Sequence, residues 1–199
     1  ETDLAESLVN AGFVVVGVNS PYGSSAVTLS QTSEVVGVSP KLKDIMSRYP
    51  GSRPELITYR KAEHALWVND VEFLVRELRS IPSSALQHID WDQINIVGFS
   101  HGGFAAIDAC ERIDACRSSV NMDGYTYEQE VPTKLKHHLT LFQSGTAHYL
   151  RDLCNGRTGC FIQEINDCPL NHEGFSDAIY SKWPFTRFTG NQCGDKSVE

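Results

Sequence analysis

The stretch that most constrains the fold is a G-x-S-x-G pattern, Gly98-Phe99-Ser100-His101-Gly102. The apolar residues at 94–97 predict a buried strand before it, and the small residues after it predict a helix that begins at once. A strand that turns directly into a helix holds the serine at a sharp tip, where its glycine neighbours avoid a steric clash. The pattern predicts a nucleophile elbow, with the backbone N–H of His101 available to an oxyanion.

Helical and strand patterns alternate along most of the chain. The helical patterns cover residues 2–10, a short stretch near 42–48, residues 59–78 and residues 175–182. The strand patterns cover residues 13–18, 94–97, 118–122 and 139–142, and residues 19–54 read as a polar surface excursion. The β-branched run at 13–18 is typical of a strand buried on both faces of a parallel sheet. This alternation predicts one α/β domain over residues 1–199, with a mainly parallel sheet.

The charge balance excludes some classes of partner. The 199 residues include 17 Lys and Arg against 25 Asp and Glu, a formal net charge of −8, and the basic residues form no run. Nucleic acid and anionic membrane surfaces are therefore poor partners. The longest strongly apolar stretch, residues 13–18, is far too short to span a bilayer, so we expect no transmembrane segment.

The cysteines indicate the compartment. There are six, all in the second half of the chain: Cys110, Cys116, Cys154, Cys160, Cys168 and Cys193. An even number predicts disulfides in a secreted, extracellular protein, with a disulfide-rich part at 154–193. Close spacing favours the pairs Cys110–Cys116, Cys154–Cys160 and Cys168–Cys193. A metal site at Cys154, Cys160, Cys168 and His172 is the alternative, but its spacing differs from that of zinc sites, so we expect no metal.

A serine hydroxyl is a weak nucleophile near neutral pH, so Ser100 needs a base and an acid that orients the base. Enzymes with such an elbow have the chain order serine, acid, histidine. Parallel sheets gather catalytic groups at the carboxyl ends of their strands. Asp123 directly follows the strand pattern at 118–122 and precedes a glycine that permits a turn. We expect Asp123 to be the acid, and the open alternatives are Asp152, Glu164 and Asp167.

The same reasoning reduces the number of histidines that could be the general base. His64 and His88 precede the serine, and the side chain of His101 is expected to point away from the elbow. His137 and His138 open a strand at its amino end. Two candidates then remain, His148 and His172. We expect His172 to be the general base, because it lies in a loop before a predicted helix and beyond the last clear strand.

Several motifs resemble one branch of a known enzyme superfamily. They are Asp3-Leu4-Ala5 with Gly12-Phe13-Val14-Val15-Val16, Pro21-Tyr22, Gly98-Phe99-Ser100-His101-Gly102-Gly103, Asn121-Met122-Asp123-Gly124 and His172-Glu173-Gly174-Phe175-Ser176-Asp177. Together they resemble the platelet-activating-factor acetylhydrolase-like α/β-hydrolases, which cleave lipid or small esters. The resemblance implies Ser100 as nucleophile, Asp123 as acid and His172 as base, with no cofactor.

The resemblance also has two departures. The family has earlier strands, and the loop after one of them supplies a second oxyanion donor; here that strand would precede Asp3. We therefore expect the α/β-hydrolase sheet to lack its N-terminal strands, and an upstream segment or companion chain to complete it. The cysteine-rich part from Cys154 to Cys193 differs from the family pattern and bears on the substrate.

Three functions stay open at this stage. The first is a secreted serine esterase that acts on lipid or small carboxylic esters through Ser100, His172 and Asp123. The second is a binding or interaction protein that keeps the α/β-hydrolase scaffold with weak or no catalysis. The third is a peptidase or acyltransferase built on the same elbow.

Overall fold

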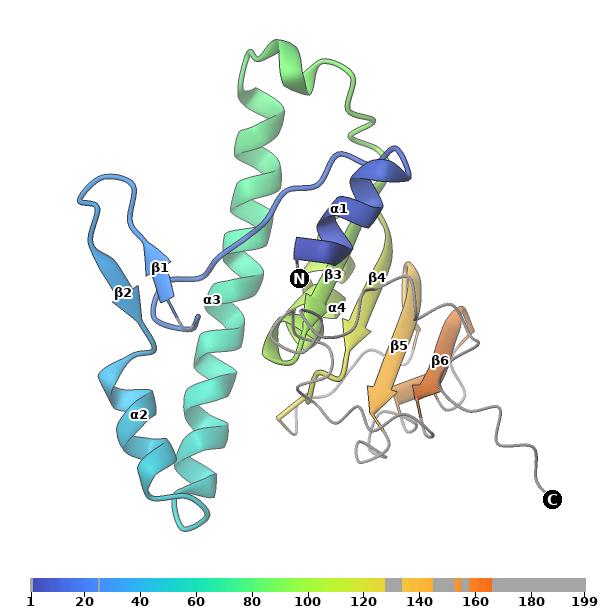
Figure 1. The fold of residues 1–199 in the computed structure, drawn as a ribbon. Coiled ribbons are helices and arrows are strands. Elements are labelled where there is room, and N and C mark those ends of the chain that lie inside the picture. The colour runs from blue at the N-terminus through green and yellow to red at the C-terminus, as the bar shows by residue number, and fades with distance from the viewer. Residues whose placement is uncertain (1, 25, 128–133, 145–152, 155–157, 166–199) are drawn as a thin grey trace, which may run out of the picture.

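The computed structural model describes residues 2–24, 26–127, 134–144, 153–154 and 158–165. In this part of the chain, four parallel strands form the central sheet (Figure 1). In sheet order they are β3 (Ile94–Phe99), β4 (Cys116–Met122), β5 (His138–Ser144) and β6 (Cys160–Ile165). Every neighbouring pair is parallel, so all four carboxyl ends lie at one edge of the sheet. The predicted α/β fold with a parallel sheet is confirmed.

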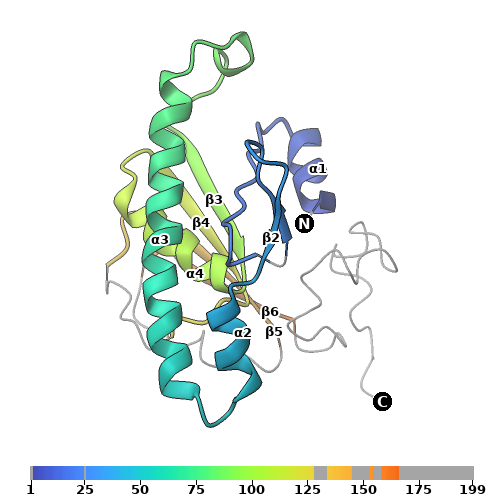
Figure 2. The same ribbon diagram turned by 90° about the vertical axis from the view of Figure 1, so that its left-hand side faces the viewer.

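The helices pack in layers beside this sheet. They are α1 (Thr2–Asn10), α2 (Pro40–Ser47), α3 (Arg53–Ser80) and α4 (His101–Arg112), with a short 3-10 turn, η1 (Ser84–Leu86). Helix α4 packs on β3 and β4, and the long α3 packs on α4. Figure 2 shows this order, with α3 outermost, α4 behind it and the sheet behind both.

The core lies on both sides of α4. Phe104 and Ile107 pack against Leu139 and Leu141 of β5, and all four side chains are fully buried. On the opposite side, Ala105 and Ala109 meet Val68 of α3, and the small side chains let the two helices approach closely. Because truncation of a buried phenylalanine costs about 3–5 kcal/mol, Phe104 is a main anchor of α4, and hence of the turn that precedes it.

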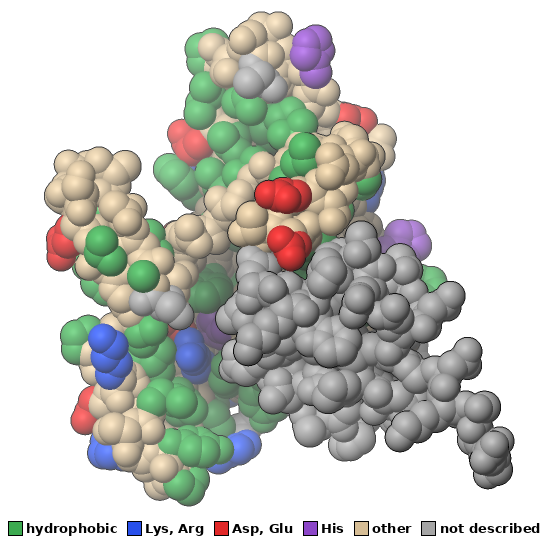
Figure 3. Space-filling view, viewed as in Figure 1, with side chains coloured by type: hydrophobic (Ala, Val, Ile, Leu, Met, Phe, Trp, Pro, Cys, Tyr) green, Lys and Arg blue, Asp and Glu red, His purple; other side chains and the backbone are tan. Residues whose placement is uncertain are grey.

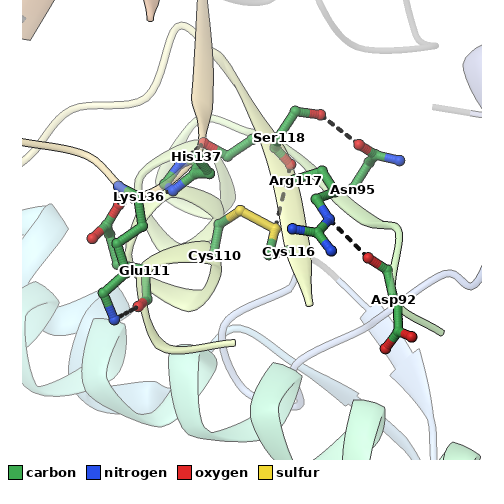
Figure 4. Close-up of a disulfide and its surroundings, with 10 residues drawn as sticks. Asp92, Asn95, Cys110, Glu111, Cys116, Arg117, Ser118, Lys136 and His137 are labelled. Carbon is green, nitrogen blue, oxygen red and sulfur yellow. Dashed lines mark hydrogen bonds and ion pairs between the residues drawn. A yellow bond between two sulfur atoms is a disulfide. The ribbon is translucent and has the colours of Figure 1, made fainter. Parts of the chain in front are cut away.

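Two disulfides lie in the described part of the chain. Cys110–Cys116 joins the end of α4 to the start of β4 (Figure 4). Cys154–Cys160 joins the segment before β6 to its first residue. Both pairs are those that the spacing predicted. Because Cys154 and Cys160 are joined, neither thiolate is available to the alternative metal site. Cys168 and Cys193 lie outside the described residues.

Polar contacts at the amino end of the sheet fasten α4 to β5. Glu111 of α4 accepts a hydrogen bond from the backbone N–H of Lys136 (2.8 Å), and its Oε1 lies 2.8 Å from Nδ1 of His137. The other ring nitrogen of His137 bonds the hydroxyl of Ser119 (2.7 Å). Burial lowers the pKa of His137, and Glu111 opposes that shift. His137 is therefore part of the scaffold at the amino end of β5 (Figure 4). Ser100 lies at the other end of the parallel strands, directly after β3.

The prediction of a strand at residues 13–18 is wrong. This segment follows α1 through Gly12, whose φ of +94° fits its predicted position after the helix. It then runs without strand pairing, and Phe13, Val14, Val16 and Val18 are each about half exposed or more, at 50, 62, 47 and 45%. The segment is apolar, as the pattern indicates, but no described strand pairs with it to form a sheet. Apolar side chains gather on this face of the molecule (Figure 3).

Three other expectations need adjustment. Within the polar excursion, β1 (Ala26–Thr28) and β2 (Val35–Gly37) form an antiparallel hairpin that the sequence did not predict. Strand β3 is the edge of the described sheet, so Val97 is 39% exposed and not buried as expected. Strand β6 was also missed.

No helix in the described part of the chain is long and apolar enough to cross a membrane. The predicted helix at 175–182 lies outside the described residues.

Candidate active site

Ser100 occupies the turn between β3 and α4. Its φ and ψ are 54° and −124°, a conformation that an L-residue rarely adopts, and its side chain does not cap α4 although it stands at the N-cap position. A Cβ at Gly98 would collide with the carbonyl group of Gly102, so only glycine fits there. The turn is held by the backbone bond from Ser100 N–H to the carbonyl of Met122 (2.9 Å). The half-buried serine thus stands where the strand ends and the helix begins.

Asp123 lies beside this turn at the end of the neighbouring strand. The parallel register pairs Phe99 with Met122, so Ser100 and Asp123 are the next residues on adjacent strands. Asp123 is 2% exposed and has a φ of 56°, and its N–H donates to the carbonyl of Phe142 (2.8 Å). A Cβ on the following Gly124 would collide with the carbonyl oxygen of Ser100. The acid candidate and the nucleophile candidate therefore share one edge of the sheet.

Asn121 holds the turn after β4 in shape. Its fully buried side chain accepts a hydrogen bond from Gly124 N–H (2.6 Å) and donates one to the Gly124 carbonyl (3.1 Å). A Cβ at Gly103 would collide with the same side-chain oxygen, so Asn121 also packs against α4. The sequence reasoning quoted Asn121 but gave it no role. An Asn two residues before an Asp-Gly turn is the signal that could have indicated it.

The side chain of His101 is buried in an aromatic cluster. Its ring meets Trp67 of α3 edge to face, with ring centroids 4.7 Å apart, and meets Tyr127 in the same way at 5.3 Å. Its Nε2 lies 3.7 Å from Glu63 Oε2, and neither ring nitrogen makes a hydrogen bond within the described part of the chain. Burial, together with smaller electrostatic effects of Arg60 and His64, lowers the pKa of His101 to about 3. His101 is therefore neutral at ordinary pH.

The backbone of His101 has a different potential role from its ring. His101 is the first residue of α4, and the first N–H groups of a helix have no acceptor within the helix. These groups carry the positive end of the helix dipole, which favours a developing negative charge. The buried ring fixes the orientation of this residue, and Trp67 and Tyr127 are the contacts that sequence reasoning did not find.

The remaining described histidines lie on elements other than the turn with Ser100, although the ring of His64 is 5.9 Å from that of His101. His64 of α3 stacks on Phe104 and its Nε2 is 2.9 Å from Asp108 Oδ2, so it joins α3 to α4. His88 lies in the exposed stretch before β3, and His137 and His138 stand at the amino end of β5. The two base candidates, His148 and His172, lie outside the described residues, as do Asp152 and Asp167; the side chain of Glu164 is not described either.

Comparison with known proteins supports the fold. No family model matches the chain, and no curated protein sequence matches it. Its structure is similar to that of a ferulic acid esterase from Streptomyces cinnamoneus, with a TM-score of 0.66 and 16% sequence identity. The match covers 92% of this chain and 51% of the esterase chain, so the chain spans about half of that protein. The chain thus has an α/β fold with a parallel sheet that matches an α/β-hydrolase esterase structure.

Proposed function

We propose that the chain is a serine esterase that cleaves carboxylic esters through an acyl-enzyme. Ser100 Oγ attacks the ester carbonyl carbon, and His172 accepts the hydroxyl proton and returns it to the departing alcohol. Asp123 orients the imidazole and stabilises its protonated form, and the His101 N–H binds the oxyanion of the tetrahedral intermediate. Water then attacks the acyl-enzyme with the same base and releases the acid. No metal or organic cofactor takes part in this scheme.

The single observation that carries this proposal is the conformation of Ser100 beside Asp123. A non-glycine residue in such a conformation costs about 1–3 kcal/mol and persists only where its surroundings impose it. Here Gly98, Gly124 and the clasp made by Asn121 all serve to bring the two turns together. A turn with no chemical role would not need a serine at the strained position, because glycine would fit without strain.

Labelling by a fluorophosphonate probe tests the nucleophile directly. The wild type should react covalently at Ser100, and Ser100→Ala should lose both the label and ester hydrolysis while it stays folded. Ser33→Ala is the matched control, because Ser33 also has a positive φ, 56°, but lies in the exposed β1–β2 turn. If Ser100→Ala keeps activity within about tenfold of wild type, the assignment of the nucleophile is wrong.

The acid and base are tested by substitutions that keep side-chain size. Asp123→Asn should lower kcat by about 10⁴, because the imidazole loses the anion that orients it. His172→Gln should be comparably damaging. If Asp152→Asn or Asp167→Asn abolishes activity instead of Asp123→Asn, the acid is misassigned. If His148→Gln does so instead of His172→Gln, the base is misassigned. Neither result changes the assignment of Ser100 as the nucleophile.

Secretion and the substrate class belong to the same proposal. The two disulfides support a secreted protein, because such bonds persist in oxidising compartments. The elbow motifs support a platelet-activating-factor acetylhydrolase-like enzyme acting on lipid or small esters. Assay of acetyl, butyryl and long-chain esters of one alcohol would distinguish these substrates.

A binding protein on the same scaffold is the second candidate. The observation that favours it is the outer edge of β3, which has no partner strand in the described part of the chain. The loop that supplies a second oxyanion donor in the family belongs on that side, and loss of one such donor costs about 10²–10³ in rate. A folded protein that fluorophosphonate does not label would favour this candidate.

A further inference from the structure

A cavity of about 690 Å³ lies on the side of α3 that faces the hairpin and α2. Its walls come from three separate segments: the turn at 20–22, Lys41 of α2 and a face of α3 that runs from Pro54 to Asp70. This volume is in the range of pockets that hold small organic ligands. Helix α2 and the segment before it lie against α3 in both ribbon views, so the cavity is built by the fold and not by one loop (Figures 1 and 2).

One wall of the cavity is shared with the elbow. Trp67 lines the cavity, and its ring also meets the ring of His101, the residue after Ser100. A Cβ at Gly102 would lie 3.6 Å from the Trp67 ring, and one at Gly23 would collide with that ring. The indole is therefore clamped between the elbow and the segment after residue 22. A ligand that fills the cavity lies one side chain away from the turn that carries Ser100.

The cavity has an aromatic and apolar lining. Tyr22, Tyr59 and Trp67 supply three rings, and Leu66 and Ala62 lie on the same face of α3. Tyr22 and Leu66 remain 53 and 63% exposed, so their apolar surface is free to be covered by a ligand. Ring stacking against such a lining adds to the gain from simple burial of apolar area.

The lining also carries hydrogen-bond acceptors. Its charged groups are three carboxylates, Glu55, Glu63 and Asp70, and one ammonium, Lys41, which lies over the ring of Tyr59 at 5.8 Å. Glu55 is paired with Arg48, with Oε2 2.9 Å from Nη2. Glu63 is only 7% exposed and bonds Arg60, but a carboxylate accepts several hydrogen bonds and so retains capacity for a donor. Hydroxyl or ammonium donors would therefore meet acceptors here, whereas a carboxylate ligand has no donor to offer to these carboxylates.

We propose that this cavity binds an uncharged or cationic ring-bearing group, with Trp67 as its end wall and Glu63 as its hydrogen-bond acceptor. As a second step, which rests on the esterase proposal, the group is the part of the ester substrate remote from the scissile carbonyl. The cavity thereby favours esters of ring-bearing alcohols over those of small alkyl alcohols.

Binding is tested first, without catalysis, by ligand-observed NMR titration with benzyl alcohol, benzylamine and benzoate. Ala62→Trp fills the cavity from an exposed position of α3, and Ala65→Trp adds the same ring to the same helix at an exposed position outside the lining. The alcohol and the amine should bind at least tenfold tighter than benzoate. Ala62→Trp should weaken both by at least tenfold, and Ala65→Trp should leave them unchanged. Glu63→Gln should weaken binding of the amine more than binding of the alcohol.

Equal binding of benzoate, or equal behaviour of the two tryptophan variants, would overturn the cavity proposal. The substrate step is then tested by hydrolysis of benzyl acetate and methyl acetate. Ala62→Trp should raise KM for benzyl acetate at least tenfold relative to Ala65→Trp, and an unchanged KM overturns the second step. If neither ester is cleaved but benzyl alcohol still binds in a manner blocked by Ala62→Trp, the esterase proposal fails and the binding site stands.

Discussion

Replacement of His101 by phenylalanine should stabilise the protein, and the gain should increase as the pH falls. Burial lowers the pKa of His101 from 6.5 to about 3, so between these values the unfolded chain binds a proton that the folded chain does not. The free energy of unfolding of the wild type therefore decreases toward acid, by up to about 1.4 kcal/mol for each unit of pH in this window. Phenylalanine keeps the ring contacts with Trp67 and Tyr127 but has no titratable nitrogen.

The size of the stability difference follows from the pH range between the pKa of His101 in the unfolded and in the folded chain. Between about pH 6.5 and 4.5 the stability difference between His101→Phe and wild type should grow by about 2 kcal/mol. Near neutral pH the variant should already be about 1 kcal/mol more stable, because the two ring nitrogens of His101 are buried without hydrogen bonds. The pKa of His137 is lowered as well, but this residue is common to both proteins and cancels in the difference.

Urea unfolding at a series of pH values, followed by circular dichroism, measures this difference. The matched control is His88→Phe, at an exposed histidine before β3, which should give a curve parallel to that of the wild type. A stability difference for His101→Phe that stays constant from about pH 7 to pH 4.5 would refute the reasoning. It would mean that the ring takes up its proton in the folded state, and therefore that water or Glu63 reaches it.

Three further predictions concern the elbow, the cysteines and the open strand edge. The free energy of unfolding of Ser100→Gly, measured in urea, should exceed that of Ser100→Ala by about 1–2 kcal/mol, because glycine relieves the strained turn. Equal urea midpoints for the two variants would contradict the strain. Thiol titration under denaturing, non-reducing conditions should find no free thiol, and loss of Cys110–Cys116 by double alanine substitution should cost about 2 kcal/mol; two or more free thiols would contradict the pairing. Because β3 has no outer partner in the described part of the chain, the protein should self-associate through this strand edge. A monodisperse monomer in light scattering would refute this last expectation.

The sequence by itself determined the features that depend on near neighbours along the chain. The alternation of strand and helix patterns gave the fold class, and the boundaries of α1 followed from its apolar periodicity and Gly12. The spacing of Gly98 and Gly102 predicted a strand–turn–helix at Ser100; the turn leaves no room for a Cβ at Gly98, whereas a Cβ at Gly102 would meet only an ordinary contact with Trp67. Close spacing also favoured the two described disulfides, since six residues of separation allow little choice of partner.

Only the tertiary structure decided what lies beside each element. The run at 13–18 has the composition of a buried strand, but burial depends on a neighbouring strand, and in the described part of the chain it has none. Asp123 was chosen from its position after a strand, yet its approach to Ser100 depends on the parallel register of β3 and β4 and on the clasp by Asn121. The contacts of His101 with Trp67 and Tyr127 join residues far apart in sequence, and no local pattern encodes them. Periodicity specifies which face of an element is apolar, whereas packing specifies what covers that face.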